Sequence, residues 1–477
     1  MGQEVRSVAV LNGSPDATVG SVGVESAVHQ DNRLSYTDQA MFLALRATGE
    51  ESMAQLVWVY ERPVDLDAVR KLHENLGFGL FGRRIETSPL PFGRHRWVAA
   101  TGPAAPLDIE QSARPRTELT DWADERAGLP IDPETGPGWR LGVLPMTDGS
   151  TAISLEISHC LTDGMGAVLT ITDAMKGVRR ELGYPEPRSR STARALKTDA
   201  RETLRSLPEV ARTVAKTVRL AYRRRNDISR SAPPPPVAYA GDPDVEVLVP
   251  AISVFVDLDE WDRRAEELQG NSHSLLAGFA ARLGARLGRQ RLDDGAVSLL
   301  IPIADRAEND TRANAVSLDS IAVNPAPVTT DLSDARAAIR AGFKKRRDEP
   351  DESLELLPLI PFVPKIAVRR GADVLFGFAD LPVSCTNLGD LDPALGRADG
   401  NDCAYLMLRG VNGRIPRKLL EQRRGLLTVA SGRIGGQISI TVVGYEPGAV
   451  NTKQSLRDHV VHVLGEFGLT GIRQAEG

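Results

Sequence analysis

The chain of 477 residues is poor in cysteine, with only Cys160, Cys385 and Cys403. These three form neither a C-x-x-C pair nor the even set that a disulfide framework requires. Free thiols of this kind are typical of proteins from a reducing compartment. We therefore expect a cytoplasmic protein whose structure does not depend on disulfides.

An excess of one charge is also missing. Lys and Arg number 58 against 63 Asp and Glu, which gives a net charge of −5. Nucleic-acid-binding domains usually carry a basic excess, so the composition gives no reason to expect a nucleic-acid partner. Long apolar runs are absent too, and no window reaches the ~20 residues of a membrane-spanning helix.

Strand-like and helix-like patterns follow one another without strict alternation, which predicts a mixed α/β protein. The length permits at least two cores, and the run SAPPPP at 231–236 predicts an extended connection between two halves. We expect a loose lead-in over residues 1–30, an N-terminal lobe over 31–187, a basic helical and proline-rich linker over 188–243, and a C-terminal lobe over 244–470.

The first part of this linker is strongly basic. Residues 188–225 hold twelve Lys and Arg but only three acidic residues, and Leu207, Val210, Val214 and Val218 recur at helical spacing. Such a basic amphipathic helix can bind an anionic partner or an anionic membrane surface. Alternatively, its apolar stripe packs on the body of the protein and its charges are simply solvated.

One glycine-rich motif points to a function that its context excludes. Residues 77–82 match G-x-G-x-x-G, the fingerprint of dinucleotide-binding proteins. That fingerprint must follow a strand and open a helix, because the phosphate binds at the helix N-terminus. Here a predicted helix precedes the glycines and a strand-like stretch follows them, so we do not expect a nicotinamide or flavin site.

The stretch from Thr151 to Met175 carries the candidate chemistry. It reads as a strand over residues 152–157, a polar turn with His159 and Asp163, and a helix that opens at Gly164. A histidine placed in a turn at a strand end is suited to general-base catalysis. No second cluster of His, Asp or Glu accompanies it, so we expect no metal site, and the neighbouring Cys160 is expected to be a buried, inert thiol.

Residues Ser158 to Gly164 read S-H-C-L-T-D-G, which resembles the H-H-x-x-x-D-G motif of the chloramphenicol acetyltransferase-like acyltransferases. This superfamily includes peptide-synthetase condensation domains, polyketide-associated acyltransferases, plant alcohol acyltransferases and wax ester synthase/diacylglycerol acyltransferases. Ser158 stands where the fullest form of the motif has a first histidine. Looser similarities to family motifs are found at Leu34 to Phe42 (the L-S-x-x-D of the wax ester branch), Gly82 to Ile85, Leu300 to Arg306, and Ser384 to Gly389.

The resemblance implies a fold and a set of roles. It implies two similar lobes, each a mixed β-sheet flanked by helices, with a tunnel between them. It implies that His159 is the general base, that Asp163 turns away from His159 to pair structurally with an arginine, and that Gly164 shapes the turn. Three arginines are candidates for the partner of Asp163: Arg83, Arg84 and Arg140. Three further residues are candidates for binding the oxyanion or the substrate: Thr386, Asn387 and Ser158.

The function that follows from this resemblance is transfer of an acyl group from a thioester to a hydroxyl, most simply on a lipid-like acceptor. Acyl-coenzyme A or an acyl carrier protein would be the donor substrate, and no cofactor is expected. Formation of an amide, as in condensation domains, and non-catalytic binding of acyl groups or lipids remain open. The basic residues 188–225 would contact a carrier protein or an anionic membrane surface, which would make the cytoplasmic protein peripherally membrane-associated.

Overall fold

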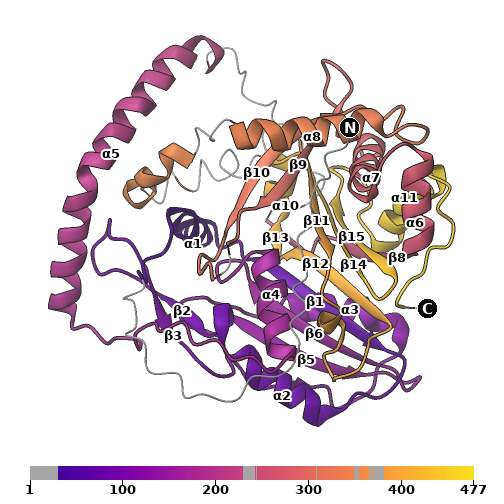
Figure 1. Ribbon diagram of the computed structural model, residues 1–477, viewed down its shortest axis with the longest axis horizontal. Coiled ribbons are helices and arrows are strands. Elements are labelled where there is room, and N and C mark those ends of the chain that lie inside the picture. Colours follow the sequence, from indigo (N-terminus) through magenta and orange to yellow (C-terminus); the bar gives the residue numbers. More distant parts are fainter. Residues whose placement is uncertain are drawn as a thin grey trace, which may run out of the picture. The chain divides into compact units, whose positions relative to one another are not determined.

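The computed structural model describes residues 31–228, 242, 244–307, 309–348, 354–364, 368 and 381–476. The predicted lead-in over residues 1–30 and the proline-rich run 231–236 lie outside these ranges. The chain from Asn32 onward forms one compact unit. It is built around two β-sheets, and each sheet with its helices is called a lobe below (Figure 1).

The first lobe contains a sheet with the strand order β12-β1-β6-β5-β4. These strands are β1 (Ser52–Tyr60), β4 (Asp108–Ile109), β5 (Trp139–Pro145), β6 (Thr151–Ser158) and β12 (Tyr405–Asn412). Helices α2 (Leu66–Leu76) and α4 (Gly164–Met175) pack on one face of the sheet, and α3 (Leu119–Ala127) packs on the other. Every residue of β6 is buried because the strand has neighbours on both sides and helices on both faces.

The second lobe contains a sheet with the order β10-β9-β11-β14-β15-β8, in which β11 runs parallel to both of its neighbours. The strands are β8 (Ala251–Asp257), β9 (Val297–Ala304), β10 (Val316–Val323), β11 (Val383–Asp390), β14 (Leu426–Ile434) and β15 (Gln437–Tyr445). Its main core is formed with α6 (Leu258–Glu267), α7 (Ser272–Arg286), α8 (Ser333–Asp348) and α11 (Lys453–Glu466).

One strand of the second half of the chain completes the sheet of the first lobe. Strand β12 pairs antiparallel with β1, from Ser52 opposite Asn412 to Val59 opposite Tyr405. In Figure 1 the orange β12 therefore lies beside the indigo strands of the first lobe. The two halves of the chain are thus joined by backbone hydrogen bonds within the first sheet.

The remaining elements are shorter or lie at the margins of the sheets. The first lobe also has α1 (Tyr36–Thr48), the ribbon of β2 (Arg83–Glu86) and β3 (Arg96–Ala99), and the long helix α5 (Thr192–Ile228). The pair β7 (Glu246–Val247) and β13 (Ile415–Pro416) lies next to α10 (Arg417–Gln422). Four 3-10 segments complete the description: η1 (Gly79–Phe81), η2 (Arg116–Glu118), η3 (Leu354–Phe362) and η5 (Pro393–Gly396).

The expected fold class is confirmed, with two sheets and flanking helices. The strand predicted at 152–157 is β6, and the helix predicted to open at Gly164 is α4. The glycines of G-x-G-x-x-G follow helix α2 and lead into β2, with Gly79 at φ +60° in the turn between them. They therefore have the wrong context for binding a dinucleotide, as predicted.

Candidate functional site

His159 is positioned by the end of a buried strand. Its backbone N–H continues the ladder of β6 by donating to Ser52 O at 2.8 Å, and the chain then leaves the sheet in a turn closed by Leu161 N to Ser158 O at 3.0 Å. Helix α4 begins immediately afterwards, with Asp163 as its N-cap. The imidazole is thus held at the junction between strand and helix and is only partly buried.

The imidazole of His159 contacts Asn314, a residue between β9 and β10. His159 Nδ1 lies 3.0 Å from Asn314 Oδ1. The other end of the amide, Nδ2, faces two acceptors, His159 O at 3.2 Å and Asp38 Oδ1 at 3.4 Å. Because these acceptors fix the orientation of the amide, its oxygen faces the ring, and Nδ1 carries the proton. Nε2 is left with its lone pair, and we find no hydrogen-bond partner for it among the described residues.

Asp38 anchors Asn314 from helix α1. The carboxylate of Asp38 is 1% exposed and accepts from Ala313 N at 3.1 Å and Asn314 N at 2.8 Å. Ser35 caps the same helix by accepting from Asp38 N. The two polar residues of the L-S-x-x-D segment thus have separate tasks, since Ser35 caps the helix and Asp38 holds the backbone beside His159.

Asp163 forms a separate ion pair on the other side of the turn. Its Oδ2 accepts from Arg306 Nη2 and from Ala315 N, each at 2.8 Å, and its Oδ1 accepts from Gly166 N at 2.7 Å. Both side chains are less than 10% exposed. The carboxylate is occupied by these donors, whereas His159 Nδ1 is bound to Asn314, so the two motif residues do not form a catalytic pair.

The partner of Asp163 predicted from sequence is therefore wrong. The three candidates were Arg83, Arg84 and Arg140, but the ion pair is made by Arg306. Arg140 donates to Pro130 O at 3.0 Å on the surface, and Arg84 lies in β2 with its side chain near Gly136. Arg306 follows β9 and reaches the N-cap of α4 from the second lobe.

Arg83 has a different structural task in the same region. It is fully buried, stacks on the ring of Trp97 at 3.8 Å, and donates to Leu161 O at 2.8 Å and to Thr311 O. Burial lowers the pKa of its guanidinium. Arg83 therefore ties the motif turn to the segment that carries Asn314.

That segment, residues 305–307 and 309–315, is called the bridging loop. It connects β9 to β10 in the second lobe and crosses to the first lobe, where Asp163 N also donates to Ala313 O at 2.8 Å. Figure 1 shows the β9–β10 pair reaching towards α1 and the start of α4. The candidate site is thus assembled from both lobes.

Gly164 and Gly166 both lie in the first turn of α4, but only Gly166 has no room for a side chain. A Cβ at Gly166 would lie 2.3 Å from Thr162 Oγ1 and 2.9 Å from Arg306 Nη2, whereas a Cβ at Gly164 would meet Leu388 at 3.2 Å. The close approach of Arg306 to the helix therefore requires a glycine at 166. Gly164, the glycine predicted from the motif, is the less constrained of the two.

Ser158 does not face a substrate. It is fully buried, and its hydroxyl donates to Glu51 and accepts from Cys160 N at 3.2 Å. A hydroxyl has one donor, and Glu51 occupies it. Ser158 is thus a structural residue, which corrects its assignment as an oxyanion or substrate candidate. The adjacent Cys160 is buried as expected, and burial raises the pKa of its thiol.

Thr386 and Asn387 lie on β11, whose Leu388 contacts the start of α4 at Gly164. Asn387 Nδ2 lies 3.0 Å from Nδ1 of His273 in α7, and its Oδ1 accepts from Gly389 N. Successive strand residues face opposite ways, so Asn387 faces His273 of α7, and its role as an oxyanion donor stays a prediction. Thr386 shares the face of Leu388 and remains a prediction.

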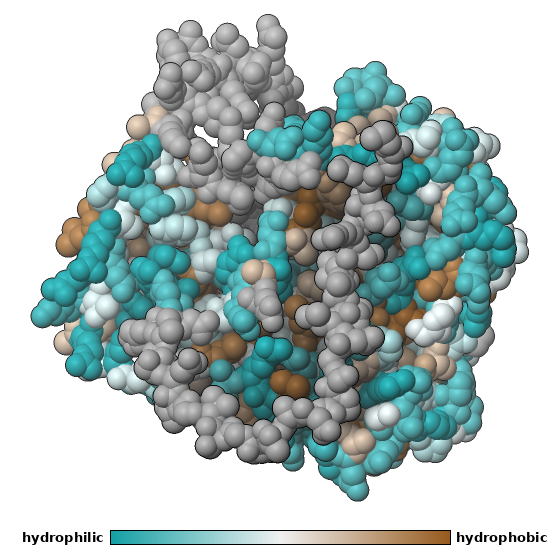
Figure 2. Space-filling view, in the orientation of Figure 1, coloured by the Kyte–Doolittle hydropathy of each residue, from teal (hydrophilic) through white to brown (hydrophobic). Residues whose placement is uncertain are grey.

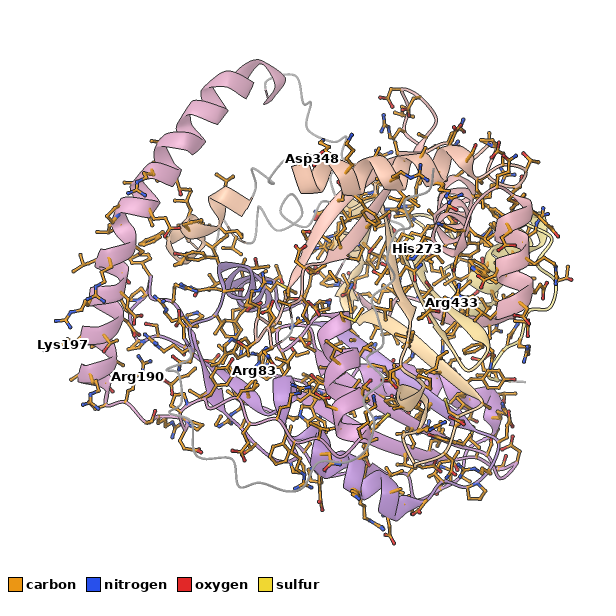
Figure 3. The ribbon with its side chains drawn as sticks, viewed as in Figure 1. Arg83, Arg190, Lys197, His273, Asp348 and Arg433 are labelled. Carbon is orange, nitrogen blue, oxygen red and sulfur yellow. The ribbon has the colours of Figure 1, made fainter. Side chains whose placement is uncertain are left out.

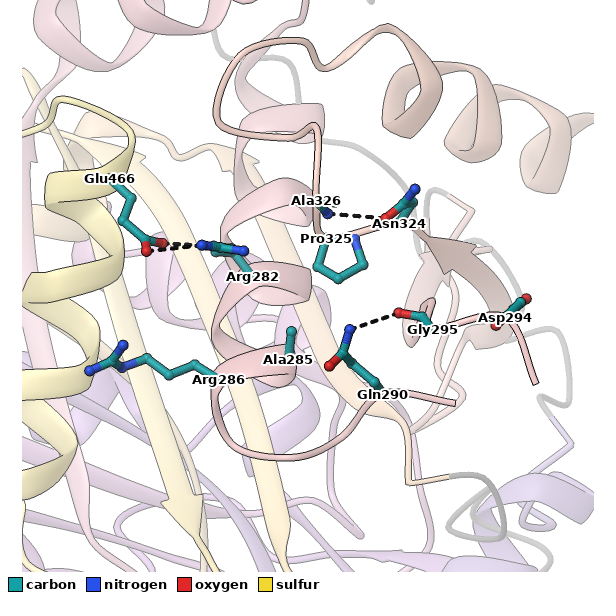
Figure 4. A pocket seen from close by; sticks show the side chains of 10 residues that line it. All are labelled: Arg282, Ala285, Arg286, Gln290, Asp294, Gly295, Asn324, Pro325, Ala326 and Glu466. Atoms are coloured by element: carbon teal, nitrogen blue, oxygen red, sulfur yellow. Dashed lines mark hydrogen bonds and ion pairs between the residues drawn. The ribbon is translucent and has the colours of Figure 1, made fainter. Parts of the chain in front are cut away.

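A surface cavity of about 390 Å³ lies elsewhere, between α7, α11 and the turns at 290–295 and 324–326 (Figure 4). Two of its four charged lining residues pair with each other, since Arg282 donates to Glu466 at 2.7 Å and 3.0 Å. No motif residue lines it, so we do not connect it with His159. In the described ranges there is no group of three His, Cys, Asp or Glu that could hold a metal ion, and no helix there has the length and apolar character needed to cross a bilayer.

Comparison with known proteins identifies the fold. Neither a protein-family model nor a curated sequence matches the chain. Among solved structures, the first condensation domain of the CDA synthetase is similar with a TM-score of 0.56 at 12% identity, covering 94% of this chain and 98% of that one. The wax ester synthase/diacylglycerol acyltransferase from Marinobacter aquaeolei VT8 is similar with a TM-score of 0.51 at 14% identity, covering 92% and 99%.

The chain has the chloramphenicol acetyltransferase-like fold. The same condensation domain in complex with a substrate analogue gives a TM-score of 0.54 at 14% identity, over 94% of this chain and 99% of that one. These similarities extend over both lobes, which confirms the resemblance inferred from S-H-C-L-T-D-G at the level of fold. Identities this low establish the fold and leave the activity to be argued from the site.

Three residues that complete the site were not assigned from sequence. Arg306 ends the segment Leu300 to Arg306, which had been noted as similar to a family motif, so its signal was visible but its partner was not. Asp38 stands in the L-S-x-x-D segment in the same way. Asn314 carries no sequence signal, because only the fold of the bridging loop brings it to His159.

Proposed function

We propose that the protein is an acyltransferase that moves an acyl group from a thioester, acyl-coenzyme A or an acyl carrier protein, to a hydroxyl acceptor. The observation that carries the proposal is the contact of His159 Nδ1 with Asn314 Oδ1 at 3.0 Å, which leaves Nε2 as a free base. A positioned base of this kind contributes about 10²–10⁴ in rate. The shared fold of a condensation domain and a wax ester synthase/diacylglycerol acyltransferase supports this reaction class.

The reaction balances with His159 as the one proton carrier. Nε2 accepts the proton of the acceptor hydroxyl while the oxygen attacks the thioester carbonyl, and a tetrahedral oxyanion forms. The oxyanion collapses, the C–S bond breaks, and the thiolate takes the proton back from Nε2. The products are an ester and a free thiol. Thr386 is the candidate donor to the oxyanion, where one well-placed donor is worth on the order of 10²–10³ in rate.

Asp163 contributes structure in this scheme and takes no proton. Its pairing with Arg306 holds the start of α4 against the bridging loop, and the same loop presents Asn314 to His159. Donor and acceptor would reach His159 through a tunnel between the lobes. The L-S-x-x-D segment around Ser35 and Asp38 resembles the wax ester branch, which favours a lipid-like alcohol as the acceptor.

The test is release of free thiol from a panel of acyl-coenzyme A and acyl-carrier donors, offered with alcohols and with amines, followed by identification of the product mass. We expect thiol release that depends on an alcohol, yields an ester, and falls at least about 100-fold in His159→Ala. His462→Ala, which removes a half-exposed histidine on α11, is the matched control and should retain activity.

Two results would contradict the proposal. Amide products without ester would assign the chain to condensation chemistry. Retention of a bound acyl ligand, with no turnover and no difference between wild type and His159→Ala, would make it a binding protein.

A further inference from the structure

The basic helix α5 is fixed to the first lobe through its acidic residues. Asp199 is buried and contacts Arg190 at 2.9 Å and Ser88 Oγ at 2.6 Å, and Glu202 pairs with Arg96 at 2.5 Å. These contacts neutralise two of the three acidic residues of segment 188–225, and both of these residues lie on the inner face of the helix. They hold the helix in one rotational orientation against the body.

The outer face of α5 therefore carries uncompensated positive charge. Five basic residues are exposed there: Arg194, Lys197, Arg201, Arg205 and Arg212. Their spacings of three, four, four and seven residues place them within an arc of about 80° on a helix of 100° per residue. None of the five has an ion-pair partner in the described part of the chain, and the third acidic residue, Glu209, lies about 40° outside the arc. We call these five residues the cationic stripe.

Figure 3 shows the difference between the two faces directly. Lys197 points outward from α5, whereas Arg190 lies on the inner side next to β2. Arg190 contacts Asp199 and Glu86, so it belongs to the attachment of the helix and not to the stripe. Among the described side chains of α5, the basic surface predicted for residues 188–225 thus consists of the five residues of the stripe. Five further basic side chains lie outside the described part of the chain: Lys216, Arg219, Arg223, Arg224 and Arg225.

An exposed apolar stripe runs beside the cationic one. Leu196, Leu204, Leu207 and Val214 are between 40% and 64% exposed. They occupy the neighbouring arc of about 80° on the same helix. In Figure 2, teal and brown atoms lie side by side along the left edge, where Figure 1 places α5.

We propose that the cationic and apolar stripes of α5 dock the protein on an anionic lipid surface. Helices that lie in the membrane interface combine Lys and Arg, which meet anionic headgroups, with aliphatic side chains that enter the acyl boundary. The stripe from Arg194 to Arg212 runs for about 27 Å along the helix, which contains Pro208 and bends along its length in Figure 1. Its apolar residues are spread along this length instead of gathered at one centre, which fits a flat lipid surface better than the compact hot spot of a protein partner.

This inference does not require the proposed activity, and its test is separate. Full-length protein is sedimented with vesicles of phosphatidylcholine, with and without phosphatidylglycerol, at low and high salt. We expect binding only to the anionic vesicles, and loss of that binding at high salt. Each cation at such a surface is worth about fivefold in partition, so Arg201→Glu/Arg205→Glu should weaken binding at least about 25-fold.

The matched control is Arg70→Glu/Lys71→Glu, which makes the same change of charge at exposed positions of α2 and should bind like wild type. Leu204→Gln should weaken binding several-fold at unchanged charge. All variants should release thiol from a soluble acyl-coenzyme A at the wild-type rate, which separates docking from catalysis.

The proposal is overturned if wild type does not distinguish the two vesicle compositions, or if the α5 and α2 double variants bind equally. Binding of an acidic acyl carrier protein that depends on Arg201 and Arg205, without vesicle binding, would also overturn it and assign the stripe to a protein partner.

Discussion

Three carboxyl groups lie beside the same turn, and they differ in the groups that face them. Asp163 meets the guanidinium of Arg306 and two backbone N–H groups. Asp38 meets amide donors alone in the described part of the chain, two from the backbone and one from Asn314. Glu51 receives one hydroxyl, from Ser158, and its second oxygen is buried with no hydrogen bond in the same part of the chain.

The difference separates three tasks that the motif alone does not distinguish. A carboxylate with a buried cation is a structural lock, because removal of either partner leaves a charge unpaired. A carboxylate that binds amides can orient a neighbour, as Asp38 orients Asn314. A carboxyl group with one hydroxyl is poorly compensated for burial, and burial raises the pKa of Glu51 to about 7.

The largest expected effect is the loss of stability when the ion pair between Asp163 and Arg306 is broken. Asp163→Ala should lower the free energy of unfolding by about 3–5 kcal/mol, since Arg306 is left buried without its partner. Asp38→Asn should cost only about 1–2 kcal/mol, because it weakens hydrogen bonds without stranding a cation. Urea denaturation monitored by tryptophan fluorescence compares the two variants.

The double variant Asp163→Ala/Arg306→Ala supplies the control. If the two residues form one pair, its destabilisation should be smaller than the sum of the single effects. An Asp163→Ala protein with wild-type stability that had lost only turnover would show instead that Asp163 takes part in the chemistry.

The next prediction concerns Glu51, the buried carboxyl group that has a single hydrogen bond to Ser158. In the unfolded chain Glu51 loses its proton near its ordinary pKa of about 4.5, whereas in the folded protein it keeps the proton until about pH 7. The folded state therefore binds more protons in this window, and its stability falls as the pH rises from 4.5 through 7. Glu51→Gln cannot ionise, so it should be more stable than wild type above pH 7, by up to about 3 kcal/mol, and similar to it below pH 4.5.

Glu61→Gln is the control with the opposite sign. Hydrogen bonding to Arg116 lowers the pKa of Glu61, so ionised Glu61 stabilises the fold above its unfolded pKa. Its loss should lower stability slightly at neutral pH, because the pair is exposed. A stability profile of Glu51→Gln parallel to that of wild type from pH 4.5 to 8 would mean that Glu51 ionises normally in the folded protein.

The next prediction concerns Asn314, which the Asp38 carboxylate holds in contact with His159. Its replacement tests whether this orientation matters for turnover. Asn314→Ala removes the acceptor of His159 Nδ1, so both neutral tautomers become available and turnover should fall about 10- to 100-fold, as expected for one buried hydrogen bond. Nitrogen NMR of the imidazole should show protonated Nδ1 in wild type and a mixture of tautomers in the variant. Equal tautomer spectra with reduced turnover would assign Asn314 a merely structural role.

The sequence was sufficient for the fold class and for the placement of His159 between a strand and a helix, because strand, turn and helix are encoded locally by residues 151–175. It also indicated that Asp163 needs an arginine. It could not identify Arg306, since the partner is 143 residues away and arrives through a loop whose path depends on both sheets. Of the three candidates, Arg83 was wrong for an informative reason, as this arginine is buried at the same turn but binds carbonyl groups.

The same limit explains the strands that were not predicted. β12 lies between strands of the second lobe in sequence but pairs with β1 of the first lobe. The position of β12 depends on the edge of β1, which is distant in sequence, and no local sequence pattern predicts that pairing. Ser158 was misassigned, and the contact of Asn387 with His273 was not foreseen. A motif gives residue identity and spacing, whereas the direction of a side chain depends on which face of the strand is buried.

The smallest expected effect distinguishes the two glycines that open α4. Gly166→Ala would force a methyl group against Thr162 and the guanidinium of Arg306, and should lower the free energy of unfolding by about 1–2 kcal/mol. Gly164→Ala meets the end of the Leu388 side chain at 3.2 Å, which can move, so its cost should stay below about 1 kcal/mol and can be offset by the better helix propensity of alanine.

In the Arg306→Ala background the penalty of Gly166→Ala should shrink, because one of the two obstructing groups is gone. If Gly164→Ala were instead the more destabilising variant, the glycine of the motif would be the constrained one, and the position of Arg306 over the first turn of α4 would need revision.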